Sequence, residues 1–241
     1  MTALLFRDDA YAASCPAIVI ASGPDGVELD RTVFYAESGG QPGDTGALVL
    51  PDGGAIPVLD AVHPGRDRTR VLHLLPGDAP RPAPGARVEA RIDAARRRRL
   101  MRMHTALHLL SVVLPLPVTG GAIGDGRGRL DFDMPEPPGD PGALEAALAA
   151  HVAADLSVTA EWIEEAALDV DPGLVKTLRA PPPRGQGRVR LIRIGEGAAT
   201  IDLQPCGGTH VARTGEIGRL ALGKIEKKGR ENRRVHLRLA D

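Results

Sequence analysis

The sequence predicts an α+β protein with two domains, a small β domain at residues 1–92 and a mixed α/β domain at residues 93–241. Short apolar or alternating runs fill the first domain, and Gly, Pro and Asp separate them at short intervals, as in a barrel or sandwich. A segment without Gly or Pro, residues 87–113, predicts a long helix. Helical and alternating segments follow it, so we expect this helix to pack against a mostly antiparallel sheet.

Strands, linkers and helices can be placed along the chain from the same patterns. In the long helix, Leu100, Met103, Leu107 and Leu110 form one apolar face, and Pro115 ends the pattern. The predicted N-terminal strands are 15–20, 26–29, 32–35, 46–50, 56–59 and 70–75, followed by a linker at 76–85 and a last strand at 87–93. Beyond the helix we expect a hairpin at 118–133, a helix at 143–156, strands at 158–163 and 188–194, and a loop at 181–187.

The composition excludes several classes of protein. Apolar residues make up 43% of the chain, enough for a core, so the chain is not a disordered segment. Aromatic residues make up only 2%, which argues against an aromatic platform for stacking bases. No apolar run has membrane-spanning length, the N-terminus carries no secretory signal, and two cysteines leave no disulfide framework. We therefore expect a cytoplasmic protein without membrane contact.

Charge is distributed unevenly along the chain. The formal net charge of −1 argues against a generic coat for nucleic acid. However, residues 131–175 contain eleven acidic residues and no Lys or Arg, whereas residues 184–241 contain thirteen basic and six acidic residues. Four consecutive arginines at 96–99 add a second basic cluster, although such a run can also be an ordinary solvated helix face. Segregated charge is typical of a protein that presents one basic face to phosphates.

Two pairs of residues form a candidate metal site. His104 and His108 are four apart in the predicted helix, so both imidazoles project from one side. Cys206 and His210 flank a turn with two glycines, which would let the thiolate and imidazole converge. Together they make a tetrahedral zinc set, the alternative being a structural Cys beside a turn His. Thr105 stands where helical metalloproteases place a catalytic Glu, which excludes that chemistry.

Several segments together resemble one protein family. The segments HTALH at 104–108 and CGGTH at 206–210 resemble the editing domain of alanyl-tRNA synthetases and, more closely, the freestanding AlaX-type alanyl-tRNA editing proteins. Residues 34–46, FYAESGGQPGDTG, resemble the glycine motif of this family, which includes Gly39 and Gly40 and separates it from the related threonyl-tRNA synthetase domains. Residues 129–133, 214–218 and 228–235 match further family segments, so the resemblance covers most of the chain.

The resemblance implies a fold, a cofactor and a reaction. It implies that residues 1–92 form a small β-barrel and that residues 93–241 form the zinc-binding editing domain. One Zn²⁺ per chain would be held by His104, His108, Cys206 and His210. The implied reaction is trans-editing: an aminoacyl-tRNA deacylase hydrolyses mischarged alanine tRNA, chiefly Ser-tRNA, with Gly-tRNA as a further candidate. Two alternatives stay open, a non-catalytic RNA-binding protein with a structural zinc and a zinc hydrolase of another small ester.

Substrate contacts can be proposed on chemical grounds. A site that hydrogen-bonds the serine hydroxyl would reject alanine, and Thr105 is the first candidate, with Gln41 and Thr45 as others. Thr105 could instead bond its own helix backbone. Ala122 replaces a Gln that is common in the family, which puts selectivity or rate in doubt. We expect a monomer whose tRNA-binding residues are Lys227, Lys228, Arg230, Arg233 and Arg234, together with the arginines at 96–99.

Overall fold

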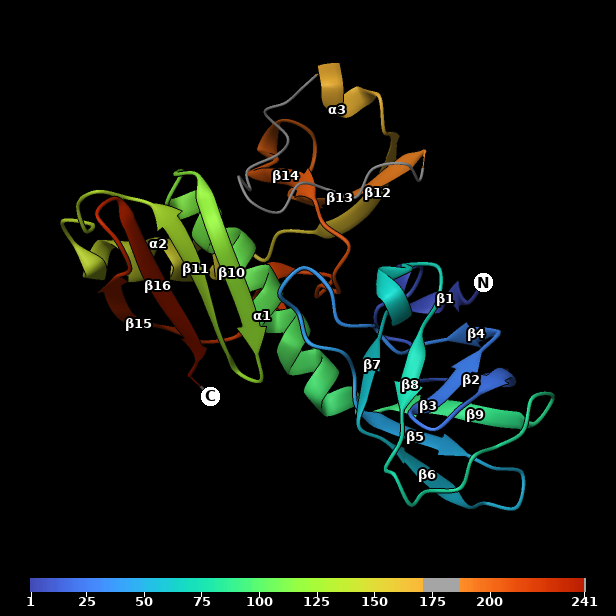
Figure 1. The fold of residues 1–241 in the computed structure, drawn as a ribbon. Coiled ribbons are helices and arrows are strands. Elements are labelled where there is room, and N and C mark those ends of the chain that lie inside the picture. The colour runs from blue at the N-terminus through green and yellow to red at the C-terminus, as the bar shows by residue number, and fades with distance from the viewer. Residues whose placement is uncertain (171–186, 241) are drawn as a thin grey trace. The chain divides into compact units, whose positions relative to one another are not determined.

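The computed structural model describes residues 1–170 and 187–240 (Figure 1). It is a mixed α/β structure with few helices and antiparallel sheets. Two compact units, Met1–Arg99 and Leu100–Asp241, divide within helix α1 (Ala94–Val113). Within the described ranges, no helix combines enough length with enough apolar character to span a bilayer. The loop predicted at 181–187 lies outside the described residues, apart from Gly187.

The first unit is built on a seven-stranded antiparallel sheet in the order β6-β5-β9-β2-β3-β8-β7. Its central strand β2 pairs with β9 through residues 14–18 and with β3 through residues 19–22, and the register shifts between Val19 and Ala21. The strands are β2 (Ser14–Ser22), β3 (Gly26–Leu29), β5 (Gly46–Val49), β6 (Ala55–Val58), β7 (Asp60–Val62), β8 (Leu72–Leu74) and β9 (Arg87–Ile92), and β1 (Ala3–Leu4) pairs in parallel with β4 (Arg31–Thr32).

The predicted small β-barrel is not confirmed: the described residues form no closed barrel, because β6 and β7 are edge strands and no pairing joins them. Strand β2 explains the difference. Its register shift lets β2 pair with β9 through its first half and with β3 through its second half. The apolar faces of these two parts of the sheet enclose one core without closing the hydrogen-bond ladder. The strand predicted at 32–35 is wrong beyond Thr32. The following residues are buried but irregular, and Phe34 and Tyr35 give their backbone N–H groups to side chains rather than to a strand.

A buried ion pair fixes the start of α1 to the glycine motif within the first unit. The side chain of Arg97 is 2% exposed and that of Asp44 is 1% exposed. The Nε of Arg97 donates to Asp44, Nη1 donates to the carbonyl of Ala10, and Nη2 donates to the carbonyl of Val33. Asp44 also accepts the backbone N–H of Tyr35 at 2.6 Å. Arg97 is therefore a structural residue, and the prediction that it contacts RNA phosphates is wrong.

The second unit contains two antiparallel sheets, and the four-stranded one lies beside α1 (Figure 1). Met103 and Leu107 fill the space beside Gly128, so the helix packs directly against β11. The four-stranded sheet has the order β10-β11-β16-β15, with β10 (Val118–Gly124), β11 (Arg127–Asp133), β15 (Leu220–Lys227) and β16 (Asn232–Leu239). The three-stranded sheet contains β12 (Val158–Glu164), β13 (Arg188–Ile194) and β14 (Asp202–Pro205). The described part of this unit also contains the α-helices α2 (Pro141–Ala153) and α3 (Ala167–Val170).

The four apolar residues predicted to form one face of α1 are all buried, but Met101, Ala106 and Leu109 are buried as well. The helix is thus surrounded in the second unit rather than lying on its surface. The hairpin predicted at 118–133 is confirmed by the pairing of β10 with β11. The second helix is also confirmed, and it begins earlier than predicted because the side chain of Asp140 accepts two backbone N–H groups as its N-cap.

We expect the buried His73 to make stability depend on pH. Its Nδ1 lies 3.1 Å from the carbonyl of Val27, and its Nε2 lies 2.8 Å from the hydroxyl of Thr32. Burial lowers the pKa of His73 to about 4. Unfolding restores a pKa of about 6.5, so the unfolded state binds the proton more tightly and stability falls as the pH drops from about 6.5 to about 4. The expected loss is roughly 3 kcal/mol.

Urea unfolding of the wild type and of His73→Gln at several pH values measures this loss. The Gln amide can still donate to Val27 and accept from Thr32, but it does not titrate. The variant should therefore lose about 3 kcal/mol less than the wild type between pH 7 and pH 4. The matched control is His63→Gln, because His63 lies outside the core. Identical pH profiles of wild type and His73→Gln would contradict the expectation.

Candidate metal centre

The second unit brings the four predicted metal ligands together. His104 and His108 come from α1, while Cys206 and His210 come from the segment that follows β14. One donor atom from each residue lies within 4.8 Å of the other three. The Sγ of Cys206 is 3.4 Å from Nε2 of His104 and 3.3 Å from Nε2 of His210. Tetrahedral zinc with bonds of about 2.0–2.3 Å needs ligand atoms about 3.3–3.6 Å apart, so these residues fit the ion.

Strand β13 holds the turn that carries Cys206. The Nη1 of Arg190 donates to the carbonyls of Cys206 at 3.0 Å and Gly208 at 2.9 Å, and the backbone N–H of Cys206 donates to the carbonyl of Arg190 at 3.1 Å. The glycines were expected to permit a tight turn, but neither Gly207 nor Gly208 has a positive φ. Arg190 is therefore the residue that fixes this turn, a contact between segments that sequence reasoning did not predict.

A buried carboxylate supports His108. The Oδ2 of Asp202 lies 2.9 Å from Nδ1 of His108 and accepts a hydrogen bond of 2.9 Å from Nε2 of Gln204. Sequence reasoning missed both Asp202 and Gln204. The signal available was their alternation in residues 201–206, because Asp202, Gln204 and Cys206 share one face of an extended strand.

Thr105 supports His210 rather than standing open to a substrate. Its side chain is fully buried. The hydroxyl donates to the carbonyl of Met101 at 3.1 Å, accepts the backbone N–H of Val211 at 3.3 Å, and lies 3.1 Å from Nδ1 of His210. One donated and two accepted bonds use the full capacity of a hydroxyl. The bond to Met101 confirms the alternative interpretation of Thr105, a hydroxyl bonded to its own helix.

The electrostatics of the cluster favour a thiolate. Burial alone would raise the pKa of Cys206, but the neighbouring His104 and His210 hold it well below the usual range for a thiol. Burial and the charge of His104 lower the pKa of His210. Burial opposes the protonated form of His108, yet hydrogen bonds to Asp202 and Cys206 raise its pKa to about 9. A soft thiolate beside imidazoles is the donor set that suits zinc.

The glycine motif forms a tight turn in the first unit. Ser38 and Gln41 exchange two backbone hydrogen bonds of 3.0 and 3.1 Å, and Gly39 and Gly40 between them have φ values of 58° and 83°. Positive φ at both central positions is the geometry of a type I′ turn, which explains the paired glycines. The side chain of Gln41 is buried, whereas Thr45 is half-buried. Thr105, by contrast, lies with the four candidate ligands in the second unit.

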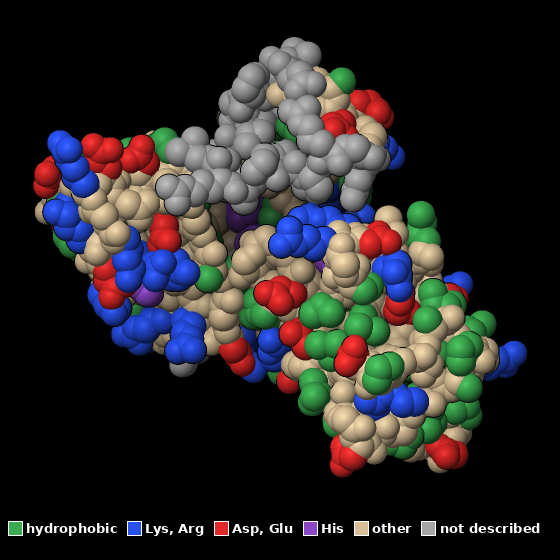
Figure 2. All heavy atoms as spheres, in the orientation of Figure 1, with side chains coloured by type: hydrophobic (Ala, Val, Ile, Leu, Met, Phe, Trp, Pro, Cys, Tyr) green, Lys and Arg blue, Asp and Glu red, His purple; other side chains and the backbone are tan. Residues whose placement is uncertain are grey.

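Some of the predicted tRNA-binding residues are exposed to solvent, whereas others are already bonded within the protein. Figure 2 shows Lys and Arg side chains gathered over β15 and β16. Lys227, Lys228 and Arg230 are exposed there. Arg234 instead donates two hydrogen bonds to the carboxylate of Asp131, and Arg233, with a side chain only 12% exposed, donates to the carbonyl of Pro135. Arg233 and Arg234 therefore connect β16 to β11 and to the segment that follows β11.

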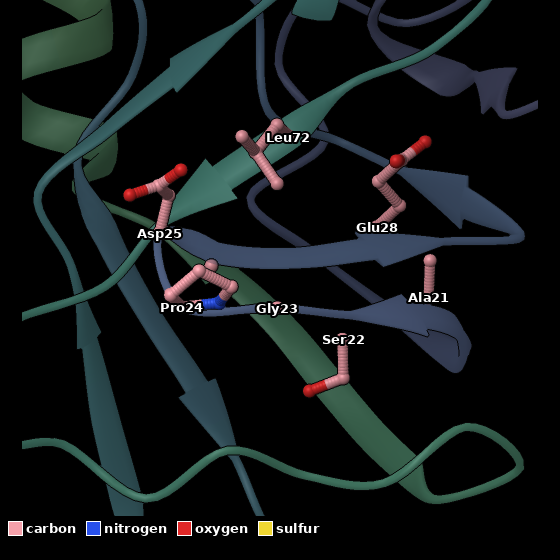
Figure 3. Close-up of a pocket in the computed structure, with 8 residues that line it drawn as sticks. Ala21, Ser22, Gly23, Pro24, Asp25, Glu28 and Leu72 are labelled. Atoms are coloured by element: carbon pink, nitrogen blue, oxygen red, sulfur yellow. The ribbon is translucent and has the colours of Figure 1, made fainter.

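A separate pocket in the first unit lies at the turn between β2 and β3 (Figure 3). Its one charged side chain besides Asp25 is Glu28, which already accepts a hydrogen bond of 2.9 Å from Nε of Arg70. None of the predicted site residues lines it; its lining residues are 21–26, Glu28 and Leu72. The metal centre is therefore the candidate functional site of the described residues.

Comparison with known proteins first relates this chain to a domain of aminoacyl-tRNA synthetases. Residues 189–236, which run from β13 to β16 and include Cys206 and His210, match the family "Threonyl and Alanyl tRNA synthetase second additional domain". The alanine–tRNA ligase of Caldivirga maquilingensis is 36% identical over 234 residues, which cover 92% of this chain and 25% of the ligase. The chain thus corresponds to about a quarter of that synthetase.

Full-length relatives then define the family. The alanyl-tRNA editing protein AlaX-M of Methanosarcina acetivorans is 35% identical over 251 residues, which cover all of both chains. AlaX-M of Methanosarcina mazei is 32% identical over 252 residues, covering all of this chain and 98% of the relative. The chain belongs to the AlaX-M family of alanyl-tRNA editing proteins, which are aminoacyl-tRNA deacylases.

Protein purified without added metal should contain about one zinc per chain, because four donor atoms already converge. Elemental analysis by mass spectrometry measures the content. His104→Ala and Cys206→Ala each remove a donor and should lower the zinc content strongly. His151→Ala removes a histidine outside the cluster and should not change it. A folded wild type without zinc, or equal content in all variants, would contradict the metal site.

Proposed function

We propose that this protein hydrolyses the ester of mischarged alanine tRNA in trans, chiefly Ser-tRNA and also Gly-tRNA, in a zinc-dependent reaction. The observation that carries the proposal is the convergence of His104, His108, Cys206 and His210 in a chain whose whole length matches alanyl-tRNA editing proteins. The proposed setting is the cytoplasm, with the protein acting as a monomer.

The chemistry demanded of the protein is modest. An aminoacyl ester is already activated, so holding it beside a polarised water can suffice without a covalent nucleophile. Because four protein ligands leave no open position, zinc held by all four residues would act through its positive charge, which would orient the 3′ end of the tRNA. Polarising a bound water would require Cys206 or His210 to leave the metal. Cys206 is half-buried whereas the three histidines are buried. The ester would therefore approach the centre from the side of Cys206.

Selectivity for serine requires a partner for its hydroxyl. Thr105 is fully engaged with Met101, His210 and Val211, so we assign it to the support of His210 instead. Thr45 and Gln41 of the glycine motif stay as candidates, and the half-buried Thr45 is the more accessible of the two. A hydroxyl contact made in the transition state contributes about 1–3 kcal/mol when its loss leaves a buried partner unpaired.

We expect wild-type protein to deacylate Ser-tRNA much faster than Ala-tRNA. Thr45→Val should slow Ser-tRNA deacylation by roughly tenfold to a hundredfold and leave Ala-tRNA deacylation nearly unchanged, since only serine offers a hydroxyl. Thr105→Val should lower both rates together, because it acts through His210. Single-turnover deacylation of both substrates by zinc-loaded protein measures these rates.

Two results would contradict this account of function. Equal rates on both substrates would favour an unselective zinc hydrolase. Binding of tRNA without any deacylation by zinc-loaded protein would favour an RNA-binding protein with a structural zinc. A Thr45→Val variant with wild-type selectivity would remove Thr45 alone from the proposal.

The proposed tRNA contacts are three exposed cations of the second unit, Lys227, Lys228 and Arg230. Each phosphate that they neutralise would release counterions, so binding should weaken steeply as salt rises. Replacing Lys227 and Lys228 by Ala should reduce the slope of log Kd against log salt by roughly 1.5 to 2. Titration of labelled tRNA at several salt concentrations measures the slope. Arg87→Ala, in the first unit, is the control, and an unchanged slope in the double variant would place the RNA elsewhere.

A further inference from the structure

Asp202 has the position and chemistry of a residue that prepares the metal centre without being a ligand. It begins β14, and its side chain is 0% exposed. Side chains two apart on a strand share a face, so Asp202, Gln204 and Cys206 succeed one another on the same side. The strand carries the carboxylate that contacts His108 and leads directly into Cys206, the candidate ligand one residue beyond its end.

The hydrogen bonds around Asp202 determine which nitrogen of His108 carries the proton. An ionised carboxylate only accepts hydrogen bonds, so its contact of 2.9 Å with Nδ1 requires a hydrogen on that nitrogen. The Nε2 of Gln204, at 2.9 Å, is a second donor to the same oxygen. It also lies 3.1 Å from Nδ1 of His108, but a nitrogen that donates its hydrogen to Asp202 cannot accept one from the amide. Gln204 therefore fixes the carboxylate. When His108 is neutral, as a metal ligand must be, its lone pair lies on Nε2.

His210 also carries its hydrogen on Nδ1, but its hydrogen-bond partner is a neutral hydroxyl. Thr105 already donates its hydroxyl hydrogen to the carbonyl of Met101, so it accepts from Nδ1 of His210. The Nε2 of His210 is the atom beside Sγ of Cys206. One imidazole is thus held by a carboxylate and the other by a hydroxyl. A carboxylate partner also raises the basicity of the ligand nitrogen, which a hydroxyl does to a smaller extent.

We propose that Asp202, fixed by Gln204, is a positioning residue that holds His108 in the Nδ1–H tautomer and so presents Nε2 as a metal ligand. This inference rests on the proposed zinc site. Loss of such an outer partner typically lowers metal affinity by about tenfold to a hundredfold. Asp202→Asn should therefore bind metal at the wild-type stoichiometry but with an affinity lower by that factor, because all four ligands are still present.

The test is a competition titration of metal-free protein with Co²⁺ against a chromophoric chelator. Asp202→Asn should raise the dissociation constant for Co²⁺ by tenfold or more, while the thiolate-to-cobalt absorption band from Cys206 persists. Asp133→Asn, at an exposed position on β11, should leave the constant unchanged. A folded Asp202→Asn protein with wild-type affinity would overturn the inference. Failure of the wild type to bind Co²⁺ at all would overturn the metal site itself.

A second measurement requires no variant and covers the case in which Asp202→Asn does not fold. Long-range proton–nitrogen NMR correlations of the zinc-loaded wild type report the tautomer of each histidine. The expected result is a hydrogen on Nδ1 of His108 and a metal-bound Nε2. A His108 that binds the metal through Nδ1 would overturn the inference, and activity plays no part in this readout.

Discussion

The hydrogen bond between Nδ1 of His108 and Oδ2 of Asp202 joins residues 94 positions apart, and the candidate site depends on it. It connects α1, which is surrounded by the second unit, to β14, whose end leads into the turn with Cys206. Arg190 fixes that turn from the neighbouring strand. His104 and His108 on the helix can thus meet Cys206 and His210 in the turn. Buried polar contacts, and not only apolar packing, hold the two segments together.

Such a cluster is costly in a core without an ion. Three imidazoles, a thiol and a carboxylate lie together, and buried polar or charged groups destabilise a fold unless each is satisfied. The hydrogen bonds of Thr105, Gln204 and Asp202 satisfy the outer atoms of His108 and His210, which leaves the inner donor atoms for a ligand. An ion that binds only the folded arrangement stabilises it in turn, so metal binding and folding of this unit are coupled.

The sequence was sufficient to predict that His104, His108, Cys206 and His210 come together, since spacings of four on a helix and across a short turn place donor atoms locally. The alternation of Asp202, Gln204 and Cys206 indicated which side chains share a face, but the partners of the supporting residues were not predictable. Asp202 contacts His108 and Arg190 contacts the turn of Cys206, and each pair is distant in the chain. Arg97 illustrates the opposite error. Four consecutive arginines indicate a solvated basic face, yet Asp44 buries one of them, which only the tertiary fold reveals. The open sheet has a similar cause, because the register shift in β2 follows from pairing partners rather than from local residue preference.

X-ray absorption spectroscopy at the zinc edge tests the central claim most directly, since it reports the atoms bound to the ion in the intact protein. The arrangement of His104, His108, Cys206 and His210 predicts one sulfur ligand at about 2.3 Å and three nitrogen ligands at about 2.0 Å. The Cys206→Ser variant should lose the sulfur contribution while the nitrogen contribution remains. A zinc environment without sulfur in the wild type, or with two sulfur ligands, would contradict the account.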